Sequence, residues 1–187
     1  MLFHLGPGER RVLLRAARDS INRALSGGKK IPEGLPDIPD TLKQPCGAFV
    51  TLTKYGDLRG CIGYVEAQAP LYETVVTAAK SAAFRDTRFE PVTSDEMKDI
   101  EIEISILKPP SPVESWKDIE LGRHGIILSK RGRRALFLPH VATERNWDLP
   151  TTLTHLAMKA GLASDDWREG ASYEVFEAEV FGEREEL

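Results

Sequence analysis

The sequence predicts an α+β protein made of two similar halves behind an N-terminal helix. Two observations support this class. Segments with helical spacing of apolar residues are interspersed with segments in which apolar and polar residues alternate. In addition, the order hairpin, helix, helix, strand occurs twice, over residues 46–107 and 125–181. We interpret this order as a duplicated unit, and we expect residues 1–187 to form one domain with halves of about 1–108 and 109–187.

The first expected element is an amphipathic helix over residues 7–26, because its apolar side chains fall on one face. Pro7 suits the first turn, and Gly27 and Gly28 provide the stop. A proline-rich connection over residues 29–45 follows, which we expect to lie as an extended arm over the surface. The apolar residues expected to anchor this arm are Ile31, Leu35, Ile38 and Leu42.

The first half then begins with a hairpin, with strands over 47–53 and 58–65 and a turn between them. A helix over residues 70–85 follows, and the alanines on its buried face permit close approach to a sheet. Thr93 and Glu96 have the spacing of a capping box, which predicts the start of a short helix. Alternating isoleucines then predict a strand that buries one face, at residues 100–106.

The second half repeats this order after a proline-rich turn. Its hairpin spans residues 125–138, and short helices are expected over 139–145 and 150–161. The last strand is expected over residues 173–181. Its apolar residues change phase midway, which predicts a bulge or burial on both faces.

Composition excludes several classes of protein. The net charge of −4 disfavours a nucleic-acid or anionic-membrane partner, and no apolar run is long enough for a transmembrane helix. The N-terminal apolar piece is too short for a signal sequence, so we expect a cytoplasmic protein whose two cysteines remain thiols. The four histidines lack metal-ligand spacing and no phosphate loop or dinucleotide fingerprint is present, so we expect neither a metal nor a cofactor.

The hairpin segment LRGCIG, residues 58–63, is the candidate functional site. Strand alternation places Arg59, Cys61 and Gly63 on one face. A single charge roughly 6–7 Å from the thiol contributes about 2.5 kcal/mol at an effective dielectric constant near 20. That is close to the roughly 2.7 kcal/mol needed to lower a thiol pKa by about two units, provided that the site is shielded from water.

A structural interpretation of the same segment stays open. Free cysteine often fills apolar space, so Cys61 can be a packing residue. Gly60 and Gly63 admit either a ligand or another part of the protein backbone. The residues alone therefore support both a reactive or ligand-binding site and a structural role.

Other polar residues are candidates for supporting roles. Arg85 and Arg88 flank Asp86 at the end of a predicted helix, where the arginines suit either an ion pair or an anion site, and Asp86 can hold one of them. His155 suits either packing or a role as base for Cys61. The basic tip at residues 130–134 fits a solvated turn better than a nucleic-acid contact.

The sequence also resembles a known family over nearly its whole length. The segments that carry the resemblance are CGAFVTL (46–52), LRGCIG (58–63), PLYETV (70–75), AAFRDTRFEPVT (82–93), IEIEISIL (100–107), GRHGIIL (122–128), LFLPHVA (136–142) and LTHLAMKAGL (153–162). They resemble the AMME chromosomal region candidate-gene family, whose prokaryotic members are called protein A of the AmmeMemoRadiSam system. The resemblance implies an α+β fold of two parts with a cleft and a functional core at LRGCIG. It also implies pathway partners of the Memo type and of the radical S-adenosylmethionine type.

Two functions are compatible with these features. In the first, the protein is an enzyme or enzyme component that binds a small anionic or carbonyl metabolite. Cys61 is then the nucleophile, Arg59 and Arg85 orient the anion, Asp86 holds an arginine and His155 is a candidate base. In the second, the protein is a non-catalytic ligand-binding or interaction module in which LRGCIG is a recognition element.

Overall fold

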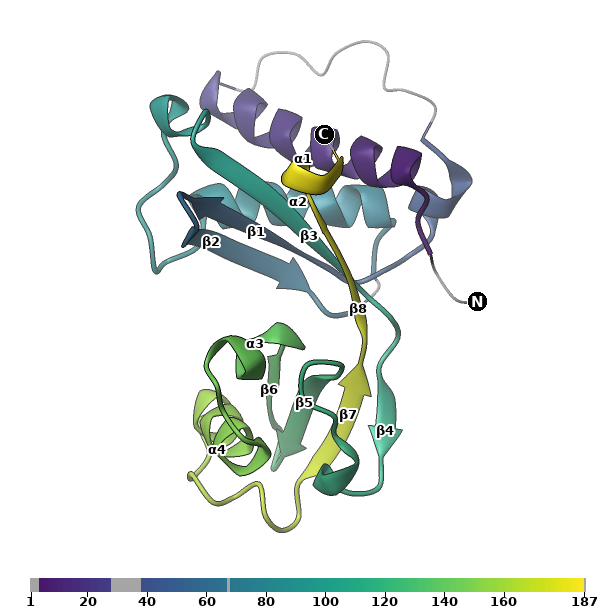
Figure 1. Ribbon diagram of the computed structural model, residues 1–187, viewed down its shortest axis with the longest axis vertical. Helices are drawn as coiled ribbons and strands as arrows, with labels where there is room; N and C mark the ends of the chain where they lie inside the picture. The colour runs from purple at the N-terminus through teal and green to yellow at the C-terminus, as the bar shows by residue number, and fades with distance from the viewer. Residues whose placement is uncertain (1–3, 28–37, 67, 187) are drawn as a thin grey trace. The chain divides into compact units, whose positions relative to one another are not determined.

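The computed structural model describes residues 4–27, 38–66 and 68–186 of the 187-residue chain. The protein has the predicted α+β class, and it divides into two compact units (Figure 1). The first unit contains Met1–Leu107 and Glu179–Leu187, and the second contains Lys108–Ala178. Each unit is built on one four-stranded sheet. None of the helices in the described ranges is long and apolar enough to cross a membrane.

The N-terminal helix α1 (Pro7–Leu25) forms as predicted, with Pro7 in its first turn. The Glu9 carboxylate accepts the backbone N–H of Gly6 at 2.8 Å, which satisfies a donor at the helix start. In the following arm, Ile31 and Leu35 lie outside the described residues. Ile38 contacts the core and Leu42 is fully buried in the short helix η1 (Asp40–Lys43), so these two anchors are confirmed.

The sheet of the first unit has the order β2-β1-β3-β8. The hairpin joins β1 (Ala48–Lys54) to β2 (Asp57–Tyr64), and its two turn residues have positive φ angles. The third strand, β3 (Ile100–Leu107), pairs with β1, so β2 forms the edge of the sheet. Helix α2 (Leu71–Phe84) connects β2 to the short helix η2 (Ser94–Glu96), which precedes β3.

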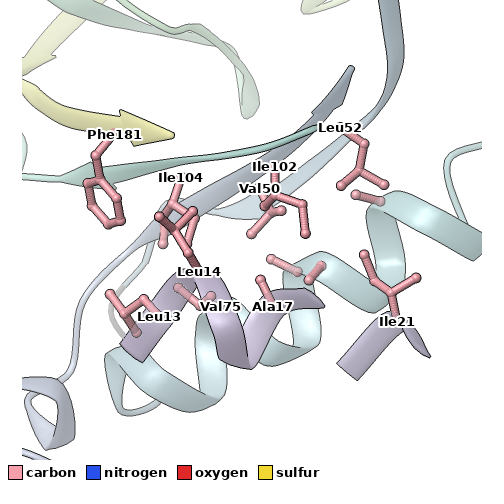
Figure 2. Close-up of a cluster of buried hydrophobic side chains, with 14 of the residues drawn as sticks. Leu13, Leu14, Ala17, Ile21, Val50, Leu52, Val75, Ile102, Ile104 and Phe181 are labelled. Carbon is pink, nitrogen blue, oxygen red and sulfur yellow. The ribbon is translucent and has the colours of Figure 1, made fainter. Parts of the chain in front are cut away.

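Helices α1 and α2 cover one face of this sheet (Figure 1). Alternate residues of β1 and β3 point toward the helices and are almost completely buried, as the alternating pattern predicts. Burial of these side chains is the main stabilising contribution in the unit. Figure 2 shows the core side chains Leu13, Leu14, Ala17, Ile21, Val50, Leu52, Val75, Ile102, Ile104 and Phe181.

The second unit has a sheet of order β4-β7-β5-β6 with a separate core. Helix α4 contributes the apolar side chains Leu153, Leu156 and Ala157 to this core, as its helical spacing predicts. Trp167 is buried beside them and donates from its indole nitrogen to Thr154 Oγ1 at 3.0 Å. The elements are β4 (Ser111–Val113), η3 (Trp116–Asp118), β5 (Gly125–Lys130), β6 (Arg133–Phe137), α3 (His140–Glu144), α4 (Leu149–Lys159) and β7 (Ser172–Phe176).

The expected last strand is divided between the two sheets. The chain leaves β7 at Phe176, and β8 (Ala178–Gly182) then joins the first sheet. The apolar pattern changes phase between Val175 and Phe176, which are consecutive residues of β7 and are both buried, so the predicted burial on both faces is confirmed there. The C-terminal residues Glu179–Leu187 therefore belong to the first unit, which differs from the expected second half of 109–187.

The short C-terminal helix α5 (Glu183–Glu186) is held to the first unit by an ion pair. Arg18 of α1 donates to both carboxylate oxygens of Glu183 at 2.6 Å and to the Ile100 carbonyl at the same distance. Charge-assisted bonds of this bidentate kind are stronger than neutral hydrogen bonds. This ion pair therefore anchors the returning C-terminal segment in the first unit.

The two units share one strand order. In each, a hairpin is followed by helical segments and by a third strand that pairs with the first strand of the hairpin, giving β2-β1-β3 and β6-β5-β7. Each sheet has a fourth strand, which lies beside the third strand of this order: β8 beside β3 in the first unit and β4 beside β7 in the second. That this shared order arose by duplication of one unit stays a prediction.

Candidate functional site

The site is built around Cys61, on the edge strand of the first sheet. Gly60 is buried against the helices, so strand alternation directs Cys61 to the opposite face, where it is partly exposed. Thr51 lies directly across the hairpin from Cys61 and donates its hydroxyl to the Cys61 sulfur at 3.4 Å. The predicted separation of Cys61 from Gly60 is therefore confirmed, and Thr51 is an additional neighbour of the thiol.

Asp86 and Arg88 hold the backbone of Cys61 from the open side of the edge strand. The Cys61 N–H donates to Asp86 Oδ2 at 2.9 Å, and Arg88 Nη2 donates to the Cys61 carbonyl at 3.4 Å. Arg88 also binds the carboxylate with both Nε and Nη2, at 2.9 and 2.7 Å. Both polar backbone groups of Cys61 thus have partners where an edge strand would otherwise leave them open.

The charge of Asp86 is maintained by these contacts. The Asp86 residue is only 6% exposed, and burial by itself would raise its pKa. The hydrogen bond from the Arg88 side chain lowers this pKa more than any other interaction does. Together with the backbone N–H groups of Cys61 and Arg88, it brings the pKa of Asp86 to about 2. The carboxylate is therefore ionised at neutral pH and remains an acceptor for Cys61.

Arg59 is bound by a carboxylate on another segment. Its Nε and Nη2 atoms each donate to Glu96 at 3.1 Å, and Lys54 donates to the same carboxylate at 3.2 Å. The hydrogen bond from Arg59 is the largest cause that lowers the pKa of Glu96 to about 2. Two cations and one carboxylate leave the cluster with one net positive charge, so the charge of Arg59 is partly compensated.

A bulge in β2 interrupts the expected alternation at Arg59. The register pairs Leu52 with Gly60 and Thr53 with Leu58, so Arg59 is the extra residue. An extra residue redirects side chains locally, which is why strict alternation does not describe Arg59. The interactions described for Arg59 connect it to Glu96 in the short helix η2, a partner that strand spacing did not predict.

The two candidate glycines are both in close contact with the protein itself. A Cβ atom added at Gly60 would lie 2.3 Å from the Ala82 carbonyl oxygen of α2. A Cβ atom added at Gly63 would lie 2.3 Å from the Phe49 ring. Gly60 therefore permits the close approach of the alanine-rich helix, and Gly63 accommodates the cross-strand aromatic ring.

Arg85 and His155 differ from the other candidates in their surroundings. Arg85 is exposed at the end of α2 and forms no ion pair within the described part of the chain, because Asp86 holds Arg88 instead. His155 belongs to the second unit, where its ring stacks on Trp147 with centroids 4.1 Å apart and planes at 10°. The contact described for His155 is thus a packing contact within its own unit.

Cys46 provides a contrast with Cys61 in the same chain. Both cysteines are thiols and not a disulfide, as predicted, but Cys46 is 6% exposed and its thiol donates to the Leu107 carbonyl at 3.3 Å. Burial raises the pKa of Cys46 to about 11. Cys46 has the properties of an apolar packing residue.

Arg88 was predicted, together with Arg85, as an arginine of an ion pair or an anion site, and Glu96 was predicted only as a helix cap. Thr51 and Lys54 were not predicted as residues of the site. Glu96 does form the predicted capping box with Thr93 in addition to its ion pair with Arg59. The register of the hairpin, which places Thr51 opposite Cys61, is the feature from which this neighbour could have been predicted. Across residues 4–27, 38–66 and 68–186, no group of three His, Cys, Asp or Glu side chains is placed to hold a metal ion.

The fold and the site define an α+β protein in which an aspartate–arginine pair holds a cysteine on an edge strand. The chain belongs to the AMMECR1 family, whose model matches residues 14–181. The matched range includes the whole of the Cys61 site and the strands of both sheets up to Phe181 in β8. Family membership therefore covers the two units together.

Relatives of similar length support this assignment. Protein MK0488 of Methanopyrus kandleri is 46% identical, over 92% of this chain and 87% of its own. A protein of Methanothermobacter thermautotrophicus is 43% identical, over 96% of both chains. The crystal structure of protein PH0010 from Pyrococcus horikoshii is 38% identical and covers 91% of this chain and 89% of its own, with a TM-score of 0.85. The similarity to PH0010 agrees with the α+β fold.

Proposed function

We propose that the protein binds a small anionic or carbonyl-bearing metabolite at the face of β2 that presents Cys61. The thiol acts there as the nucleophile or as a direct contact to the ligand. The observation that carries this proposal is that both the side chain and the backbone of one partly exposed cysteine are held by hydrogen bonds. Thr51 contacts its sulfur, while Asp86 and Arg88 hold its backbone.

The support of Cys61 favours a reactive or recognition role over a packing role. A packing cysteine needs only burial, which Cys46 has and Cys61 lacks. A reacting group needs a defined position, because small displacements of a reacting atom reduce rate strongly. The hydrogen bonds at both backbone groups of Cys61 provide such a position.

An anionic ligand is favoured by the charges of the same unit. The cluster of Lys54, Arg59 and Glu96 retains one net positive charge. Arg85 adds an exposed guanidinium next to Asp86 in the sequence, and it has no ion pair within the described residues. Guanidinium groups bind carboxylates and phosphates through paired hydrogen bonds.

A non-catalytic module is the second candidate, and the glycines favour it. Gly60 and Gly63 are in contact with Ala82 and Phe49, which are parts of the protein itself. LRGCIG is then a structural element that shapes a recognition surface, and Cys61 is part of that surface. The two candidates differ in whether ligand binding depends on the Cys61 sulfur.

Thiol labelling distinguishes the two functions. The protein is treated with iodoacetamide from pH 5 to pH 9, and modification of each cysteine is measured by mass spectrometry. Because Cys46 is buried, Cys61 should be labelled first at every pH. A nucleophilic role requires Cys61 to react faster below pH 7 than glutathione under the same conditions. If Cys61 reacts at the same rate as glutathione, the proposal that its thiol acts as a nucleophile is wrong.

Ligand binding supplies the second measurement. A panel of small carboxylates, aldehydes and 2-oxo acids is screened by thermal shift against wild type and Cys61→Ser. A ligand that stabilises the wild type and loses this effect in the variant supports the proposal. Equal stabilisation of both proteins would assign the site to the non-catalytic module instead.

The family resemblance suggests where such an activity would operate. We place the protein in the cytoplasm, in one pathway with Memo-type and radical S-adenosylmethionine proteins. If the three act in sequence, loss of each one should change the same group of metabolites. Unrelated metabolite changes in the three deletion strains would argue against a common pathway.

A further inference from the structure

The second unit contains a surface hollow at the turn that joins β5 to β6. It has a volume of about 480 Å³ and is lined by residues 129–132 on one side and 170–172 on the other. This lining contains two cations, two serines, two glycines and one alanine. The lining residues include no carboxylate and no large apolar side chain, and the two cations among them carry only hydrogen-bond donors.

The backbone of the hollow is accessible because small residues form much of its wall. Arg131 and Gly132 have φ angles of 50° and 74°, which make a tight two-residue hairpin turn. A Cβ atom added at Gly132 would meet no atom within 4 Å, so the space beside this residue is open. Gly170 faces the same hollow, also with a positive φ angle of 67°.

The two cations of the lining have different environments. The Lys130 ammonium donates to the Asp166 carboxylate and, at 2.8 Å, to the Asp166 carbonyl, and its side chain is only 10% exposed. The Arg131 side chain is 71% exposed, and its nearest guanidinium nitrogen lies 3.7 Å from the same carboxylate, beyond hydrogen-bond distance. Asp166 therefore binds Lys130 directly, whereas the donors of Arg131 remain available to a ligand.

We propose that this hollow binds the phosphate group of a small phosphorylated metabolite, with Arg131 as its principal donor. A phosphate offers negative charge and several acceptor oxygens, which match the exposed guanidinium of Arg131 in a lining whose own residues include no carboxylate. The Ser129 hydroxyl lies in the same lining and supplies a further donor. The volume exceeds that of one phosphate and leaves room for the organic part of the metabolite. This site is independent of the proposed role of Cys61.

The test uses the full chain labelled with ¹⁵N and titrated with inorganic phosphate at constant ionic strength. Saturable shifts are expected for the amides of Gly132 and Gly170. Arg131→Asn removes the guanidinium while retaining a residue that tolerates the positive φ angle, and Asn-Gly is a preferred sequence for this turn. Loss of a charge-assisted contact should weaken binding by about tenfold or more. An otherwise unchanged spectrum will show that the variant is folded.

Arg145→Gln is the matched control, because it removes one exposed positive charge of the same unit outside the hollow. It should bind phosphate as tightly as the wild type does. A sugar phosphate that shifts the same amides and binds more tightly than inorganic phosphate would support a metabolite site. The proposal is overturned if shifts spread over all cationic surfaces, or if Arg131→Asn binds as the wild type does. Equal weakening by Arg145→Gln would also overturn it.

Discussion

Replacement of Asp86 by asparagine tests the support of Cys61 most directly. Asparagine keeps the approximate shape of the side chain, and its oxygen can still accept the Cys61 N–H. It removes the charge that binds both Nε and Nη2 of Arg88. The variant should therefore fold, lose stability and hold the edge strand less firmly at Cys61.

The lowering of the Asp86 pKa on folding indicates how much stability the variant should lose. The folded protein lowers it from 3.8 to about 2, which corresponds to about 2 kcal/mol of stability at neutral pH. The Arg88 side chain is 55% exposed, so water screens the pair and we expect about 1–2 kcal/mol. Because the folded pKa lies below the unfolded one, this stabilisation is complete above about pH 5 and is lost as the pH falls toward 2.

Urea unfolding of wild type and Asp86→Asn measures the difference. At pH 7 the variant should unfold at lower urea with an unchanged slope, and the gap should narrow between pH 5 and pH 2. Asp19→Asn, an exposed substitution on α1, controls for the removal of one carboxylate. A gap below about 0.5 kcal/mol at pH 7, within the usual range for surface substitutions, would refute the reasoning. A gap that does not change with pH would refute it as well.

Two further predictions concern the same unit. Gly60→Ala should destabilise the protein by about 1–3 kcal/mol or more, because its Cβ atom would lie 2.3 Å from the Ala82 carbonyl oxygen. Thermal unfolding measures this loss, and an unchanged midpoint would mean that α2 moves away without cost. Glu96→Gln should lower stability at pH 7 by about 1 kcal/mol through lost ion pairs with Arg59 and Lys54. Because the pKa of Glu96 is lowered to about 2, that difference should fade between pH 5 and pH 2, and a difference that persisted there would contradict the assignment.

The elements of the fold were largely predictable from the sequence, because their signals are local. Helix α1 and strand β3 follow from the period of their apolar residues, and the turn at Gly132 follows from its glycine. The Thr93–Glu96 capping box was predicted by a spacing of three residues. In each case the residues that determine the structure lie within one or two turns of one another.

The details of the site required the tertiary structure. Local spacing placed Asp86 near two arginines, but only the packing of α2 against β2 shows that Asp86 also accepts the Cys61 N–H. The bulge at Arg59 depends on how β2 pairs with β1, and the ion pair of Arg59 with Glu96 depends on where folding places η2.

The sequence by itself therefore determined the class of fold, most of its helices and strands, and the segment that contains the candidate site. Tertiary structure decided that Arg88 binds Asp86, that Glu96 partly compensates the charge of Arg59 and that the last strand is shared between two sheets. The physical reason is the range of the interactions. Periodicity and capping act between neighbours in the chain, whereas ion pairs and strand order depend on segments that folding brings together.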